Sequence, residues 1–179
     1  MNMKKIALCG VLSALALISF MIENLFPPLF IPGAKLGIAN VFILFAAVVA
    51  GFKYGLFVLI VKAVLGSVFI GNASAILYSL PAGIIAFSLQ YALIFYTKNV
   101  SVVAASVVGG TVNSVLQGVT FCLITATSEY AVYFPYLALI GILGGAIVGT
   151  TVFLLIKFLP DKILDLGRME NTVNENKSI

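Results

Sequence analysis

Long apolar stretches alternate with short polar or Pro- and Gly-containing segments along almost the whole chain. A helix that crosses a bilayer needs about 20 predominantly apolar residues. The pattern therefore predicts an all-α, polytopic membrane protein with six transmembrane helices, at residues 5–24, 36–51, 54–70, 74–97, 102–127 and 134–159. We expect residues 1–160 to form one domain. Residues 161–179 are polar, so we expect a cytoplasmic tail whose end is disordered.

The composition supports an integral membrane protein of the multi-pass type. Of the 179 residues, 62% are hydrophobic and 9% are charged, with a mean hydropathy of +1.19. Soluble domains carry about 25% charged residues, so this chain cannot cover a water-facing surface. Both cysteines, Cys9 and Cys122, lie in apolar stretches and are expected to be free thiols. The net charge of +4 is better explained by membrane topology than by nucleic-acid binding.

The positions of the charges predict the orientation in the membrane. If six helices alternate, six lysines fall on one side: Lys4, Lys5, Lys53, Lys98, Lys157 and Lys162. Glu23 and Glu129, the acids that precede the tail, fall on the other side. Because cytoplasmic loops carry the excess of positive charge, both termini are expected in the cytoplasm.

Two lysines depart from this pattern. Lys35 falls on the outer side, just before the second predicted helix, and Lys62 lies inside the third. At about 1.5 Å per residue, the spacing from Lys53 places Lys62 near the middle of the membrane. Charge at that depth costs about 2.5–3.5 kcal/mol, so Lys62 should face protein or water. A ligand or ion-pair role is favoured, and a lysine that reaches the interface and stabilises packing is the alternative.

The stretch 102–127 carries the most regular polar pattern. Asn113 and Gln117 are four residues apart and so share one helix face. Asn40 and Tyr78 are expected at a similar depth in the outer part of the membrane. Together with Lys35 and Lys62, these side chains could line a cavity open to the outside. Hydrogen bonds between close-packed helices are the alternative for the two amides, and Gln90 is expected to lie apart, in the cytoplasmic half.

Small residues recur at helical spacing in two stretches. Gly141, Gly145 and Gly149 form a ridge that predicts close packing within the bundle, and Gly10 and Ala14 form a shorter pair. The shorter pair is expected either to pack internally or to dock a membrane partner.

The sequence contains no recognisable set of catalytic residues. The membrane part has no paired carboxylates, and the chain has no histidine, no Asp-rich motif, no phosphate-binding loop and no CxxC. We therefore expect no catalysis, no cofactor and no metal site. Because the chain has no ATP-binding motif, active transport would need an ion gradient or a partner, and the scarcity of intramembrane carboxylates argues against proton coupling.

Three blocks carry a resemblance to a known family: IPGAKLGIANVFILFA (31–46), VKAVLGSVFIGNASAILYSLPAG (61–83) and VNSVLQG (112–118). Over residues 6–159 the chain resembles the Gx transporter family, also called heptaprenyl diphosphate synthase component I. That family is similar to the substrate-binding S components of energy-coupling-factor transporters. The first block is the most specific in order and spacing.

The resemblance implies a six-helix bundle that captures a small molecule from outside, with residues 26–35 as a lid. It also implies docking on a transmembrane coupling protein, driven by two ATPases, through small residues of the first helix. Ala7 is followed by Val11 where a second alanine is usual, so Gly10 and Ala14 are the offset equivalent. Family members often have arginine at the position of Lys62. The lysine keeps the positive charge of that arginine but not its bidentate hydrogen-bonding geometry.

The sequence thus favours the substrate-binding subunit of an uptake transporter in a bacterial cell membrane. The expected ligand is anionic or amphipathic, with isoprenoid or quinone-related compounds as one class. The expected binding residues are Lys35, Asn40, Lys62, Tyr78, Asn113 and Gln117. A non-catalytic membrane subunit of a heptaprenyl diphosphate synthase in menaquinone biosynthesis is the alternative, and a structural membrane scaffold is a third hypothesis.

Overall fold

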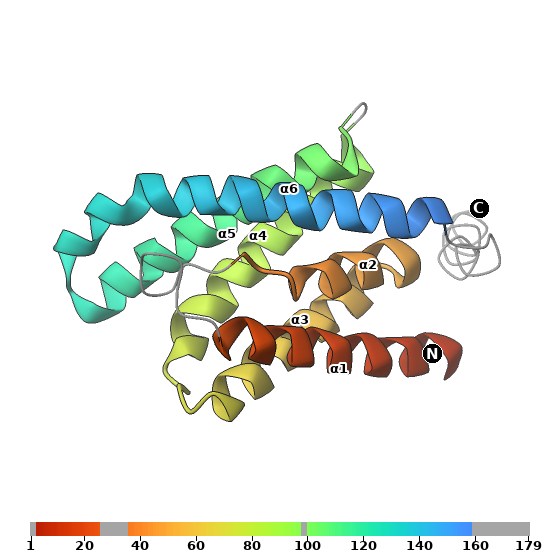
Figure 1. Ribbon diagram of the computed structural model, residues 1–179, viewed down its shortest axis with the longest axis horizontal. Helices are drawn as coiled ribbons and strands as arrows, with labels where there is room; N and C mark the ends of the chain where they lie inside the picture. Colours follow the sequence, from red (N-terminus) through yellow and green to blue (C-terminus); the bar gives the residue numbers. More distant parts are fainter. Residues whose placement is uncertain (1–2, 26–35, 98–99, 159–179) are drawn as a thin grey trace, which may run out of the picture.

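The computed structural model describes residues 3–25, 36–97 and 100–158, which are helical apart from short connections (Figure 1). The elements are α1 (Met3–Leu25), α2 (Asn40–Ala50), α3 (Phe52–Phe69), α4 (Ala75–Tyr96), α5 (Val102–Thr125), the 3-10 helix η1 (Ser128–Tyr133) and α6 (Phe134–Phe158). The predicted all-α class is confirmed. The polar tail, the segment 26–35 that is expected to form a lid, and Lys35 lie outside the described residues.

Five of these helices, all except α2, are long and apolar enough to cross a membrane. The chain is therefore an integral membrane protein, and the number of spans and the orientation stay predictions. The predicted second helix, 36–51, is wrong at its start, because α2 begins only at Asn40. Gly37 has φ +74°, which no α-helix accommodates, and the N–H of Asn40 donates to the Gly37 carbonyl at 2.8 Å in a turn.

The short helix α2 is the centre of the core. It has 11 residues, so it is about 16 Å long at about 1.5 Å per residue, roughly half of the hydrocarbon thickness. Eight of its residues are buried, and they are Val41, Ile43, Leu44, Phe45, Ala46, Ala47, Val49 and Ala50. This extensive burial means that other helices, rather than lipid, surround most of α2.

Helices α2 and α3 form a tight hairpin, as predicted, but the connection is Gly51 alone. Its φ of +108° lies in the region that favours glycine, and Phe52 already belongs to α3. Helix α2 packs on α1, where Ala16 is completely buried, and on α3, where Val58 is completely buried.

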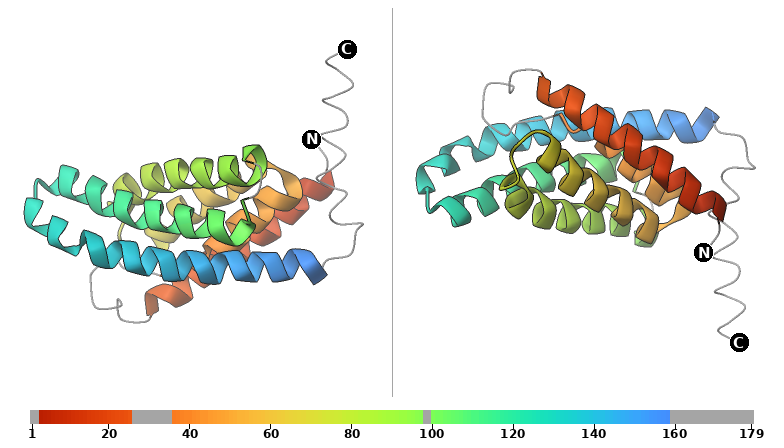
Figure 2. Two further views of the ribbon diagram at one scale, coloured as in Figure 1. Left: turned by 90° about the horizontal axis from the view of Figure 1, so that it is seen from above. Right: turned by 90° about the horizontal axis from the view of Figure 1, so that it is seen from below.

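The bundle divides into two halves along the sequence. Helices α1, α2 and α3 pack mainly against one another, and α4 and α6 both pack mainly on α5. Contacts of α3 with α4 and of α2 with α6 join the halves (Figures 1 and 2). Where α3 does not contact α4 and α2 does not contact α6, space remains between the two halves.

The glycines of α6 allow its backbone to approach that of α5. A methyl group added at Gly141 would lie 2.7 Å from the carbonyl oxygen of Gly110 and from Cα of Thr111. A methyl group at Gly149 would lie 2.7 Å from Cα of Val103. The prediction that the glycine ridge of α6 packs inside the bundle is confirmed.

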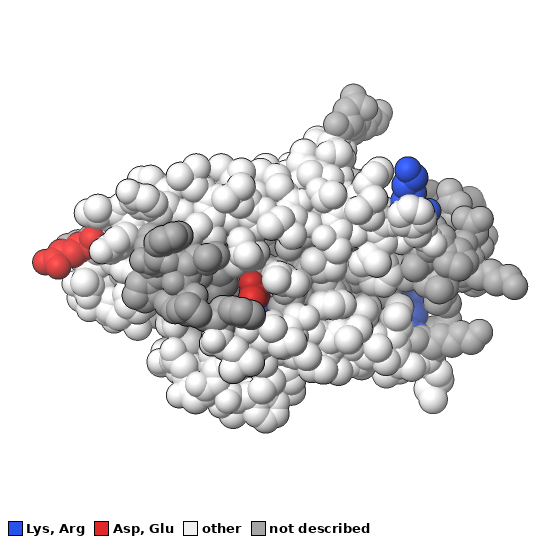
Figure 3. Space-filling view, viewed as in Figure 1, with Lys and Arg blue, Asp and Glu red and all other residues white. Residues whose placement is uncertain are grey.

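The two ends of the molecule differ in charge. The first residue of α1 and the last of α6 lie at the same end (Figures 1 and 2). Figure 3 shows basic side chains at that end, and acidic ones at the opposite tip and near the middle of this face. The orientation of these two ends in the membrane stays a prediction. Cys9 and Cys122 are free thiols, as expected.

Candidate functional site

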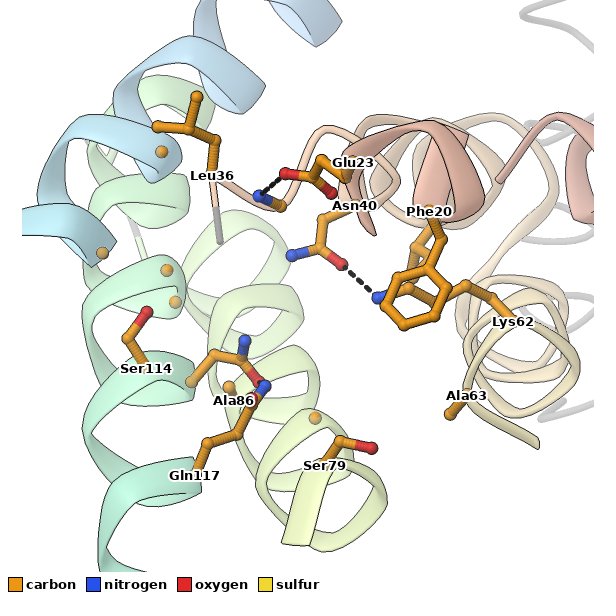
Figure 4. A pocket seen from close by; sticks show the side chains of 18 of the residues that line it. Phe20, Glu23, Leu36, Asn40, Lys62, Ala63, Ser79, Ala86, Ser114 and Gln117 are labelled. Atoms are coloured by element: carbon orange, nitrogen blue, oxygen red, sulfur yellow. Dashed lines mark hydrogen bonds between the residues drawn. The ribbon is translucent and has the colours of Figure 1, made fainter. Parts of the chain in front are cut away.

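A cavity of about 940 Å³ lies between the two halves of the bundle. All six α-helices, η1 and the segment that precedes α2 contribute to its lining. Figure 4 shows Lys62 and Asn40 on one side of this space and Ser114 and Gln117 on another. The lining therefore combines one basic group with several neutral polar groups from different helices.

Lys62 supplies positive charge to the cavity from the middle of α3. Its Nζ donates a hydrogen bond of 3.4 Å to Oδ1 of Asn40, the first residue of α2. The same Nζ lies 4.9 Å from the centre of the Phe20 ring of α1, close enough for a cation–π interaction. Three helices thus hold the ammonium group at the cavity wall (Figure 4).

Glu23, near the end of α1, binds the segment that leads into α2. One of its carboxylate oxygens accepts the N–H of Gly37 at 2.6 Å and the N–H of Ile38 at 3.2 Å. Because both bonds reach an ionised acceptor, they are stronger than bonds between neutral groups. Glu23 also lines the cavity, so it fixes the wall next to Asn40.

Helix α5 presents two amides to the cavity. Nε2 of Gln117 donates to Oδ1 of Asn113 at 3.3 Å, one helical turn away. Both side chains are partly exposed, and the described residues offer them no other hydrogen bond. The amide N–H groups of Asn113 and the carbonyl oxygen of Gln117 can therefore bond to water or to a ligand.

Aromatic rings continue the same wall beyond the amides. Phe121 lies one turn after Gln117, and the ring of Tyr78 meets it edge-on with 5.7 Å between centres. Tyr130 of η1 lies 5.0 Å from Phe121 on another side. These three rings all line the cavity, and they form a surface suited to another ring.

Gln90 also lines the cavity, so the expectation that it lies apart is wrong. Its Nε2 donates to the buried hydroxyl of Ser106 at 2.7 Å. The side chain packs on Gly109, where a methyl group would lie 2.9 Å from Cβ of Gln90. The prediction used only the depth of Gln90 along its helix. It could not foresee that Gly109, which has no side chain, lets α4 approach α5 and brings Gln90 to the cavity.

The structure brings five of the six predicted binding residues to one cavity: Asn40, Lys62, Tyr78, Asn113 and Gln117. Lys35 lies outside the described residues. That the five bind a ligand stays a prediction. Glu23 also lines the cavity but is not among the predicted binding residues, because its position near the membrane surface is already explained as a topological signal.

The small pair on α1 lies on the outer surface. Gly10 and Ala14 are both exposed, and a methyl group at Gly10 would meet nothing within 4 Å. Of the two alternatives for this pair, internal packing is therefore wrong, and docking of a membrane partner stays a prediction.

In a comparison with protein families, the family described as heptaprenyl diphosphate synthase component I matches residues 12–155, which cover α2 to α5 completely and most of α1 and α6. Neither the comparison with curated proteins nor that with solved structures finds a match.

Proposed function

The chain belongs to the heptaprenyl diphosphate synthase component I family, and from that premise we propose that it is the membrane-embedded binding subunit of a small-molecule uptake transporter. It captures an anionic or amphipathic molecule from outside a bacterial cell, in the manner of S components of energy-coupling-factor transporters. The observation that carries this proposal is the cavity between the two halves, with Lys62 at its wall.

Charge inside a membrane protein supports a binding role. A lysine in the middle of a span is costly, and such residues generally mark ligand or ion sites. Lys62 is held at the cavity wall by a hydrogen bond to Asn40 and by the ring of Phe20. An anionic ligand would form an ion pair with this ammonium group, and such a pair is stronger inside a protein than in bulk water.

The exposed face of α1 supports a partner. Gly10 and Ala14 offer a flat surface on which the backbone of another helix can lie closely. We propose that a transmembrane coupling protein, itself bound to two ATPases, docks there. This partner would supply the energy that the chain cannot obtain from ATP by itself.

Native mass spectrometry of the protein, extracted from its own membrane, tests the binding role. The proposal expects a retained small molecule that dissociates at high collision energy. A protein that is always empty, and that no small molecule stabilises, would instead support the structural scaffold.

The family description favours a second candidate, a non-catalytic membrane subunit of a heptaprenyl diphosphate synthase. Affinity purification in mild detergent distinguishes the two. Recovery with a coupling protein and ATPases supports transport. Recovery with a soluble Asp-rich synthase, whose product length changes when the subunit is absent, supports the second candidate.

A further inference from the structure

We propose that the ligand is a small acid with a planar ring, bound with its anionic group at Lys62 and its ring at the strip formed by Asn113, Gln117, Phe121 and Tyr78. This inference rests on the proposed binding function and narrows its ligand class. It excludes a polyprenyl chain as the part of the ligand that the cavity encloses.

The two recognition surfaces come from different halves of the bundle. Lys62, Asn40 and Phe20 belong to α3, α2 and α1, whereas the strip belongs to α4 and α5. All of these residues line the same cavity. A ligand that contacts both surfaces therefore has two distinct ends, and it bridges the halves where their own contacts are few.

The charges on the lining favour an acid. Among the described residues that line the cavity, Lys62 is the one cation and Glu23 the one anion. Glu23 already accepts two backbone N–H groups through one oxygen. The bond from Lys62 to Asn40, at 3.4 Å, is longer than the usual range of about 2.7–3.2 Å. A carboxylate or phosphate oxygen would form a shorter, charge-assisted bond with the same ammonium group.

The strip on α5 favours a ring. Asn113, Gln117 and Phe121 are four residues apart and line one face, so an amide pair and an aromatic ring adjoin each other. Amide groups can bond to the heteroatoms or substituents at a ring edge. Phe121 and Tyr78 already meet edge-on at 5.7 Å, the geometry in which aromatic rings pack favourably.

The same strip argues against a polyprenyl chain. A chain long enough to fill the cavity would cover Asn113 and Gln117 with hydrocarbon and remove the water that they can bond. Buried amide groups without partners are costly, so an apolar occupant would lose affinity at this wall. A chain-binding cavity of this size would be expected to have apolar side chains at these positions.

Thermal unfolding of the full chain in lipid nanodiscs tests the inference with defined probes. The ring acids are benzoate, indole-3-carboxylate and quinoline-4-carboxylate, and each is compared with its neutral carboxamide. Decanoate and farnesyl diphosphate are the chain anions. The ring acids should raise Tm, and the carboxamides and chain anions should do so less.

The variants assign the two ends. Lys62→Met should lower the affinity for the ring acids about tenfold or more, which is the factor expected for loss of a charged hydrogen bond. Lys62→Arg should retain binding, which shows that the fold tolerates change there. Gln117→Leu should weaken the binding of the ring acids and strengthen the binding of the chain anions.

Two results would overturn the inference in different ways. If chain anions bind more tightly than ring acids, and do so through Lys62, the ring assignment fails and the binding function stands. If no probe of either kind changes Tm, or if Lys62→Met has no effect on any of them, the anion site at Lys62 fails as well.

Discussion

The carboxylate of Glu23 accepts the backbone N–H of Gly37 at 2.6 Å and so connects the C-terminal end of α1 to the turn that starts α2. The helix α2 is short, buried and begins after a glycine with positive φ. Its position next to the cavity therefore depends on what holds this turn. Asn40, three residues after Gly37, is the partner of Lys62.

Glu23→Ala should destabilise the protein, because the N–H groups of Gly37 and Ile38 lose a charged acceptor. Hydrogen bonds to charged groups contribute about 1.5–3 kcal/mol, so a clear fall in Tm is expected in nanodiscs. Glu129→Ala is the matched control, because Glu129 is exposed at the start of η1. Equal, small changes in both variants would contradict a role of Glu23 in holding the turn.

Gly141→Ala should weaken the packing of α5 on α6. The added methyl group would lie 2.7 Å from the backbone of α5, and overpacking of this kind costs about 1–3 kcal/mol. The control is Gly10→Ala, where the space is open and alanine favours the helix. A comparison of the two Tm values checks the prediction, and unchanged stability of Gly141→Ala would show that the helices can separate without cost.

Gly10→Leu separates stability from partner binding. Because nothing lies within 4 Å of the added Cβ, Tm should stay near that of the unchanged protein. If a coupling protein docks on this face, the bulky side chain should prevent its recovery in affinity purification. Leu139→Ala, a change at an exposed apolar residue of α6, is the control that should leave recovery intact. Undiminished recovery of the partner with Gly10→Leu would place docking elsewhere.

The bond from Gln90 to Ser106 should appear as an energetic coupling. Gln90→Leu leaves the buried Ser106 hydroxyl without its partner, at a cost of about 1–3 kcal/mol. Ser106→Ala removes that hydroxyl, so the double variant should be less unstable than the sum of the single ones. Additive losses of stability in this cycle would mean that the two side chains do not interact.

Much of the fold follows from the apolar pattern alone. The stretches 54–70, 74–97, 102–127 and 134–159 end within two residues of α3, α4, α5 and α6. These helices are long, and each apolar stretch has clear polar ends. The second helix was placed too early, because Leu36 and Ile38 are as apolar as the helix that follows and Gly37 can occur in a helix or a turn. The positive φ of Gly37 and its contact with Glu23 show that it forms a turn.

The sequence predicted those residues of the candidate site whose polar side chains are energetically costly inside a membrane. Lys62, Asn113 and Gln117 stood out because burial in a membrane needs a reason, and the structure brings them to one cavity. Gln90 was misplaced because depth along a helix does not report how closely two helices approach. That approach depends on Gly109, which has no side chain. The sequence does not show which helix packs against this glycine, and the structure shows that it is α4.

The most direct test of the account compares ligand retention in three proteins by native mass spectrometry: the unchanged chain, Lys62→Met and Lys53→Met, each extracted from its own membrane. Lys53 is a second lysine of α3 that does not line the cavity. The account predicts that the unchanged chain and Lys53→Met retain the same small anion, and that Lys62→Met is folded but empty. Equal retention in all three proteins would contradict the claim that Lys62 binds the ligand.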